Sequence, residues 1–119
     1  MKILLVDDEQ KFVSMLAKRL ALRSIPADVV FTGDDAIHKA EKNAYDVAVL
    51  DIKMPGISGM QLKKKLHAIH PAMKFIFVTG HGSVEKTENG SEENDLYLSK
   101  PLDLDFLIET LKNMTQAEP

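Results

Sequence analysis

The sequence Ile3-Leu4-Leu5-Val6-Asp7-Asp8-Glu9 indicates the fold class of the whole chain. Its first four residues are apolar without interruption, whereas a strand with one exposed face would alternate between apolar and polar residues. Such a run is typical of an inner strand in a parallel sheet, because both of its faces need apolar cover. Three acids follow at once, so ionisable groups are expected where this strand ends.

Similar runs recur along the chain, and helical patterns separate them. The further predicted strands are Asp28 to Phe31, Val47 to Leu50, Phe75 to Val78, and a shorter run from Leu96 to Ser99 that Lys100-Pro101 ends. Apolar residues about four apart indicate helices around Phe12-Leu16-Leu20, Leu62-Leu66-Ile69 and Phe106-Leu107-Leu111-Met114. Strand and helix alternate about five times, which predicts an α/β fold with a three-layer, mainly parallel sheet.

Length and composition limit the function classes. The 119 residues fit one domain, so residues 1–119 are interpreted as a single unit. With 15 Lys and Arg against 18 Asp and Glu, the net charge of −3 gives no footprint for nucleic acid. There is no cysteine, which excludes disulfides and thiolate metal sites. The apolar run before Asp7 is too short for a signal peptide or a membrane span, so we expect a cytoplasmic protein without membrane association.

The residues that end the predicted strands form the candidate site. In a doubly wound sheet the functional crevice lies beyond the carboxyl ends of the strands. Those ends carry Asp7, Asp8, Asp51, Thr79 and Lys100. Three carboxylates at one edge repel one another unless a cation offsets them, and Mg²⁺ prefers carboxylate oxygens. The pattern therefore predicts a magnesium site beside a hydroxyl and an ammonium.

Each of these residues also has a structural interpretation. Asp8 is a suitable N-cap for the first helix, and Asp51 is a suitable turn former before Pro55-Gly56. Thr79 could be a strand-end hydroxyl, and Lys100 could face solvent. The functional interpretation depends on all of them converging at the same end of successive parallel strands.

Four linked motifs resemble those of response-regulator receiver domains, along nearly the whole chain. They are Leu4-Leu5-Val6-Asp7-Asp8-Glu9, Asp46-Val47-Ala48-Val49-Leu50-Asp51-Ile52-Lys53-Met54-Pro55-Gly56 with Gly59 following, Phe77-Val78-Thr79-Gly80, and Tyr97-Leu98-Ser99-Lys100-Pro101. The resemblance implies a doubly wound, flavodoxin-like sheet of five parallel strands in the order 2-1-3-4-5. It also implies a signalling switch in two-component systems, a protein that catalyses only its own phosphorylation and dephosphorylation.

The resemblance further implies a role for each matching residue. Asp51 would be the phosphoacceptor, and Mg²⁺ would be held by Asp7, Asp8, Asp51 and the backbone carbonyl of Lys53. Thr79 and Lys100 would contact the phosphoryl oxygens, Thr79 and Tyr97 would form the switch, and the Lys100-Pro101 bond would be cis. The phosphoryl donor would be a histidine kinase or a phosphotransfer protein, and output would pass to a downstream protein or an effector domain that this sequence lacks.

Two enzyme or carrier alternatives are weaker on the sequence. A Mg²⁺-dependent phosphohydrolase with an aspartyl nucleophile typically has a second acid two residues after that nucleophile, where this chain has Lys53. A flavin or nucleotide carrier needs a Gly-rich or hydroxyl-rich anion cradle after the first strand, where Asp7-Asp8-Glu9 would repel phosphate.

One segment departs from the family pattern. Between Gly80 and Asp95 the only large apolar side chain is Val84, so a helix there has little to bury. We therefore predict that the helix before the last strand is short or disordered, which puts output through the usual family surface in question.

Overall fold

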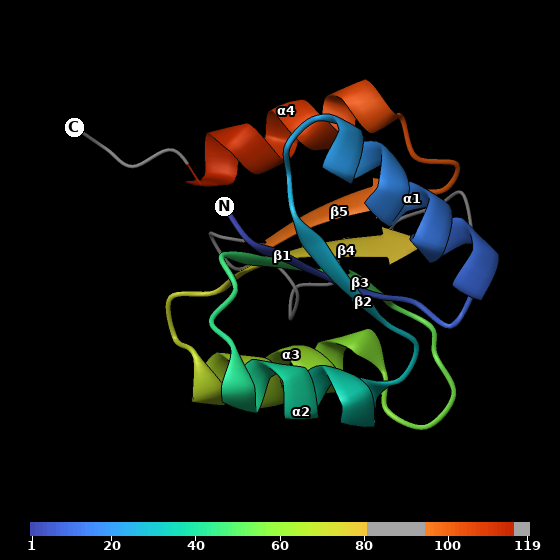
Figure 1. The fold of residues 1–119 in the computed structure, drawn as a ribbon. Helices are drawn as coiled ribbons and strands as arrows, with labels where there is room; N and C mark the ends of the chain where they lie inside the picture. Colours follow the sequence, from blue (N-terminus) through green and yellow to red (C-terminus); the bar gives the residue numbers. More distant parts are fainter. Residues whose placement is uncertain (81–94, 116–119) are drawn as a thin grey trace.

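A computed structural model describes residues 1–80 and 95–115 of the chain. Within them lie five strands and four helices (Figure 1). The strands are β1 (Ile3–Val6), β2 (Ala27–Val30), β3 (Val47–Asp51), β4 (Lys74–Thr79) and β5 (Asp95–Ser99). The helices are α1 (Gln10–Leu22), α2 (Gly33–Lys42), α3 (Gly59–Ile69) and α4 (Leu104–Thr115). Strands and helices alternate from β1 to β4, and β5 and α4 complete the described order.

All five strands form one parallel sheet in the order β2-β1-β3-β4-β5. This confirms the predicted fold and strand order. The predicted strands were located correctly, but several bounds were wrong by one residue: β2 begins at Ala27 rather than Asp28, and β4 includes both Lys74 and Thr79. Polar residues at strand ends still pair with the backbone of a neighbour, so side-chain polarity alone does not show where pairing stops.

Helices cover both faces of the sheet, as the uninterrupted apolar runs predicted. In Figure 1, α1 and α4 lie on one face, and α2 and α3 lie on the other. Alternate residues of β1 serve the two cores: Ile3 and Leu5 pack in the α1/α4 core, while Leu4 and Val6 pack in the α2/α3 core. All four are at most 1% exposed, so β1 is an inner strand with no solvated side.

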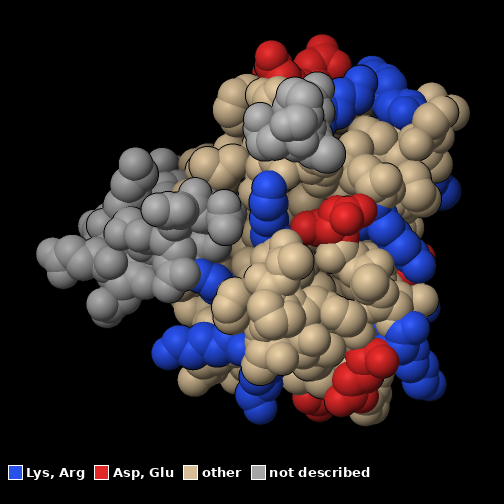
Figure 2. All heavy atoms as spheres, turned by 90° about the vertical axis from the view of Figure 1, so that its left-hand side faces the viewer, with Lys and Arg blue, Asp and Glu red and all other residues tan. Residues whose placement is uncertain are grey.

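The edge of the sheet where the strands begin is held by a small polar network around Tyr45. The Tyr45 hydroxyl donates to a carboxylate oxygen of Asp28 at 2.5 Å, and the Lys2 ammonium lies 4.0 Å from the same oxygen. The Lys2 backbone N–H donates to Asp46 at 2.7 Å. On this side of the molecule, acidic and basic side chains of the described residues are interspersed among uncharged ones (Figure 2). Neither sign of charge dominates there, in keeping with the small net charge.

Two further predictions concern the backbone between β4 and α4. The proposed short or disordered helix before the last strand lies in residues 81–94, outside the described residues. The Lys100-Pro101 peptide bond is cis, which confirms the expectation drawn from the family resemblance. Within residues 1–80 and 95–115, no helix has the length and apolar character needed to cross a bilayer.

Candidate functional site

The parallel register brings the predicted site residues to one edge of the sheet. Asp51 pairs with Val78 across β3 and β4, so Thr79 lies one position further on, beside the end of β3. The Asp7 backbone N–H bonds the Val30 carbonyl at 3.2 Å, which continues β1 to the same edge. Asp7, Asp51 and Thr79 are only 4%, 6% and 6% exposed. Buried polar side chains at a sheet edge are uncommon unless they are paired, so this edge differs from an ordinary surface.

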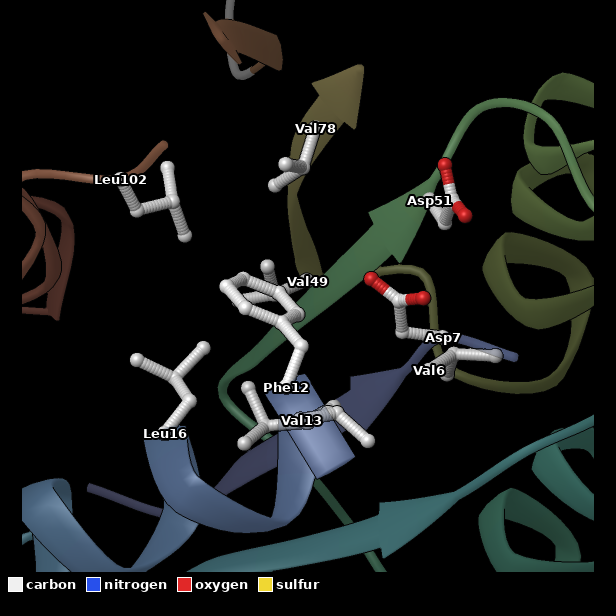
Figure 3. Close-up of a pocket in the computed structure, with 10 residues that line it drawn as sticks. Val6, Asp7, Phe12, Val13, Leu16, Val49, Asp51, Val78 and Leu102 are labelled. Atoms are coloured by element: carbon white, nitrogen blue, oxygen red, sulfur yellow. The ribbon is translucent and has the colours of Figure 1, made fainter. Parts of the chain in front are cut away.

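Three carboxylates form the centre of the site. Oxygen atoms of Asp7, Asp8 and Asp51 all lie within 4.8 Å of one another. In Figure 3 the Asp7 and Asp51 carboxylates approach each other from the ends of β1 and β3. Such a group of hard oxygen donors suits Mg²⁺, which favours carboxylates and completes its coordination with water and phosphate oxygens. The residues present therefore fit the cation that the family resemblance implies.

The structure does not support the interpretation of Asp8 as a helix cap. The residue at the N-cap of α1 is Glu9, whose side chain makes no capping hydrogen bond. The Glu9 backbone N–H instead donates to Asp7 at 2.8 Å. Asp8 is exposed, and its carboxylate belongs to the acidic group.

The environment of Asp51 disfavours its charged form. Burial is the largest cause, and repulsion from Asp7 adds to it, so the pKa of Asp51 is raised from 3.8 to about 6. The positive charge of Lys100 and the backbone N–H of Lys53 act in the opposite direction without cancelling the rise. At neutral pH the side chain is still mostly a carboxylate, which is the form required of a nucleophile.

Lys100 is held by acids on the first strand and helix. Its ammonium lies 2.9 Å from the Asp7 carboxylate and also forms an ion pair with Glu9. Its side chain is only 14% exposed, so the alternative that Lys100 faces solvent is wrong. Burial by itself lowers the pKa of Lys100, but hydrogen bonds with Glu9 and Asp7 outweigh it, so the pKa is raised overall. Lys100 is therefore a fixed cation at the edge of the acidic group.

The loop after β3 is fitted closely against the site. The Lys53 backbone N–H donates to the Asp51 carboxylate at 3.2 Å, whereas the Lys53 side chain is exposed. Gly59 begins α3, and a Cβ atom there would lie 2.7 Å from the Asp51 carbonyl oxygen. Ser58 caps the helix in a reciprocal capping box with Gln61. The close approach at Gly59 explains why a residue with no side chain stands at this position.

Tyr97 lies away from the acids, on the α2/α3 side of the sheet. Its ring stacks on Phe77 with centroids 5.1 Å apart, and its hydroxyl lies 4.0 Å from the Met60 sulfur. The Thr79 carbonyl accepts a hydrogen bond from the Lys100 backbone N–H at 2.8 Å, which joins the ends of β4 and β5. Thr79 and Tyr97 therefore lie on adjacent strands. Thr79 comes two residues after Phe77, the residue of β4 that pairs with Tyr97.

An apolar pocket lies beside the acidic group, on the α1 side of the sheet. Figure 3 shows the Phe12 ring next to Asp7, with Val49, Val78 and Leu102 around the same space. The Lys100 ammonium is 4.6 Å from the centre of the Phe12 ring. The site thus combines acids, one cation and an aromatic surface for that cation.

Sequence reasoning found five of the residues that the structure brings together but missed two. Asp7, Asp8, Asp51, Thr79 and Lys100 lie at the same edge of the sheet, as predicted. The Lys53 backbone contributes its N–H to Asp51, and the use of its carbonyl as a metal ligand stays a prediction. Glu9 was predicted only as part of the acidic run and the family motif, and Phe12 only as part of the first helix, yet both contact the Lys100 ammonium. The available signal was the position of Glu9, which directly follows the two acids.

Comparison with known proteins identifies relatives over nearly the full chain. Residues 3–112 match the family model of the response regulator receiver domain. The transcriptional regulatory protein TcrA of Mycobacterium tuberculosis is 31% identical over 119 residues, which is 99% of this chain and 47% of that protein. The response regulator ArlR of Staphylococcus saprophyticus is 25% identical over 118 residues and is covered to 54%. The chain spans about half the length of these curated relatives.

Solved structures show the same fold. The receiver domain of the hybrid histidine kinase CckA superimposes with a TM-score of 0.84 at 30% identity, covering 98% of this chain and 100% of that one. The response regulator TrrA of Thermotoga maritima, solved with Mg²⁺ and BeF, gives a TM-score of 0.83 at 28% identity, covering 95% of this chain and 97% of that one.

Proposed function

This chain belongs to the response regulator receiver domain family, and we propose on that basis that Asp51 accepts a phosphoryl group in a Mg²⁺-dependent reaction that switches the domain. The observation that carries the proposal is the group formed by Asp7, Asp8 and Asp51, with Lys100 paired to Asp7 at its edge. The proposal treats residues 1–119 as one receiver unit.

The proposed reaction is a displacement at phosphorus. A carboxylate oxygen of Asp51 attacks the phosphorus atom, a bond from that oxygen to phosphorus forms, and the bond from phosphorus to the donor's leaving group breaks. Negative charge gathers on the phosphoryl oxygens, and in this proposal the Lys100 ammonium and the Thr79 hydroxyl bind them. No general base is needed, because a pKa of about 6 leaves Asp51 mostly ionised at neutral pH.

Mg²⁺, held by Asp7, Asp8, Asp51 and the Lys53 carbonyl, would supply positive charge against the phosphoryl oxygens and relieve the repulsion among the acids. The buried positions of Asp7 and Asp51 limit water around the reacting atoms. The Lys53 N–H fixes one Asp51 oxygen, which leaves the other free to react.

The switch is proposed to couple Thr79 with Tyr97. Thr79 would move toward a phosphoryl group on Asp51, and the Tyr97 ring would respond on the neighbouring strand. In the present structure that ring rests on Phe77 and near Met60. Displacement of this ring is the conformational change that a partner would detect.

The proposed donor is a histidine kinase or a phosphotransfer protein, and the proposed location is the cytoplasm. The curated relatives are about twice as long as this chain and are named as regulators. Output is therefore proposed to pass to an effector domain or to a separate protein, without direct binding of nucleic acid or membrane by residues 1–119.

The test is phosphorylation by acetyl phosphate. Wild-type protein incubated with acetyl phosphate and Mg²⁺ should gain the mass of one phosphoryl group, and the gain should vanish when the metal is chelated. Asp51→Asn should gain none, whereas Asp34→Asn, a matched change at an exposed position on α2, should react as wild type does. A wild-type protein that stays unlabelled, or a label that persists in Asp51→Asn, would refute the proposal.

A further inference from the structure

The Lys100 ammonium rests in a clamp made by Asp7, Glu9 and Phe12. Asp7 and Glu9 supply carboxylates to it, and the Phe12 ring lies 4.6 Å away. These three residues come from the end of β1 and the first turn of α1, whereas Lys100 follows β5. The clamp thus joins two segments 91 residues apart in the sequence, at the rim of the acidic group.

The clamp holds Lys100 toward the α1 side of the site. Among residues 1–80 and 95–115, the carboxylates within ion-pair distance of the Lys100 ammonium belong to Asp7 and Glu9 and not to Asp51. Asp7 belongs to the acidic group itself, but Glu9 does not. The Glu9 side chain is 62% exposed, so water can replace it as a partner at small cost.

We propose that Glu9 is a positioning residue that competes with the phosphoryl group for Lys100 and so sets how readily the phosphorylated state forms. The inference rests on the proposed function, because it assigns a regulator to the same site. When a phosphoryl group binds at Asp51, the Lys100 ammonium must exchange its Glu9 partner for a phosphoryl oxygen. The Phe12 ring stabilises the clamped position through its negative face, which adds to the same competition.

Lys100 can exchange Glu9 for a phosphoryl group because the two partners are chemically alike. A carboxylate and a phosphoryl group are both anions that accept hydrogen bonds from an ammonium, so each can satisfy Lys100 in turn. An exposed carboxylate binds weakly, whereas a phosphoryl group within the buried site binds more strongly because water is excluded there. Glu9 therefore biases the equilibrium by a few-fold without blocking it.

Beryllofluoride with Mg²⁺ is the probe, since it mimics a phosphoryl group and binds at equilibrium. Calorimetric titration should show that Glu9→Gln binds beryllofluoride about threefold more tightly than wild type, the size of one exposed ion pair. Asp34→Asn removes one negative charge from another helix and should bind as wild type does. Unchanged or weaker binding by Glu9→Gln would overturn the inference.

A double-mutant cycle separates competition for Lys100 from a general effect of charge. In a Lys100→Met background, Glu9→Gln should no longer tighten binding, because the cation for which Glu9 competes is gone. A gain that persists without Lys100 would overturn the inference in favour of simple charge repulsion. Thermal unfolding of each variant separates binding effects from loss of fold.

A charge-retaining variant gives an independent answer if Lys100→Met binds too weakly to titrate. Glu9→Asp keeps the charge but is shorter by one methylene group, so it should weaken the clamp and bind beryllofluoride more tightly than wild type. Binding equal to that of wild type would overturn the inference. Failure of wild type to bind beryllofluoride, with Asp51→Asn behaving identically, would instead refute the proposed function on which the inference rests.

Discussion

Replacing Asp51 by Asn should stabilise the domain at neutral pH in the absence of divalent cations. The Asp51 carboxylate is buried beside Asp7 and Asp8, and its pKa is raised from 3.8 to about 6. Asn has nearly the same shape and retains an oxygen that can accept the Lys53 N–H, but it carries no charge. The substitution therefore removes repulsion while it conserves packing and a hydrogen bond.

The pKa shift gives the size of the effect. A rise from 3.8 to about 6 corresponds at most to about 3 kcal/mol, at about 1.4 kcal/mol for each pH unit. Solvent screening at the rim of the site reduces this, so we expect a gain of about 1 to 2 kcal/mol. For a domain of this size that gain raises the melting temperature by roughly 4 to 8 °C.

The dependence on pH identifies the cause. Because the folded state raises the pKa of Asp51, the folded protein retains a proton that the unfolded chain releases between pH 3.8 and about 6. The wild type therefore loses stability as pH rises through this window. The advantage of Asp51→Asn should be absent near pH 4 and complete above about pH 7.

Urea denaturation of both proteins from pH 4 to pH 8, with a chelator present, measures the difference directly. Adding Mg²⁺ at pH 7.5 should stabilise the wild type more than the variant, because the cation offsets the charge that the variant lacks. Asp34→Asn should show no comparable gain. A variant that is less stable than wild type at pH 7.5, or a difference that does not change with pH, would refute the electrostatic reasoning.

Three further predictions concern the scaffold of the site. Gly59→Ala should lower the free energy of unfolding by roughly 2 kcal/mol, because the new Cβ would lie 2.7 Å from the Asp51 carbonyl oxygen. Urea denaturation measures the loss, and a loss below roughly 0.5 kcal/mol, the size of a neutral surface change, would contradict the prediction. Ser58→Ala should lower the free energy of unfolding by about 1 kcal/mol, because the capping box with Gln61 is lost. The melting temperature should fall, and an unchanged melting temperature would show that the cap does not stabilise the domain. Tyr45→Phe should lower the free energy of unfolding, measured by urea denaturation, by about 1 to 2 kcal/mol, because Asp28 loses its hydroxyl partner. Beryllofluoride binding should stay unchanged, because Tyr45 lies at the opposite edge of the sheet from Asp51.

The sequence predicted the sheet well because its inner strands are continuously apolar and end in polar residues. The runs at Ile3 and Val47 needed cover on both faces, and this requirement alone indicates parallel strands with helices between them. The exact bounds of β2 could not be predicted, since the register of Ala27 against Ile3 depends on backbone pairing rather than on side-chain type. The strand order came from the family resemblance, because local patterns do not specify which strands are neighbours.

The acidic group was predictable for a similar reason, whereas the Lys100 clamp was not. Asp7, Asp8 and Asp51 are placed by the ends of their own strands, which the sequence shows directly. The contact of Glu9 with Lys100 depends on how a side chain bends across the gap between two segments that lie far apart in the chain. Asp8 was misassigned for a local reason: it has the residue type of a cap, but it precedes Glu9, which occupies the N-cap position of α1.

The final strand serves two separate layers of the molecule. Tyr97 belongs to the α2/α3 core and lies near Met60, whereas the neighbouring Leu98 packs in the α1/α4 core, and Lys100 reaches the Phe12 ring on that same side. Under the proposed function, phosphorylation of Asp51 would be transmitted in two opposite directions, through the Tyr97 ring on one side and the Lys100 ammonium on the other. Because Thr79 and Lys100 would bind the same phosphoryl group, changes on the two sides should be coupled rather than additive in a double-mutant cycle.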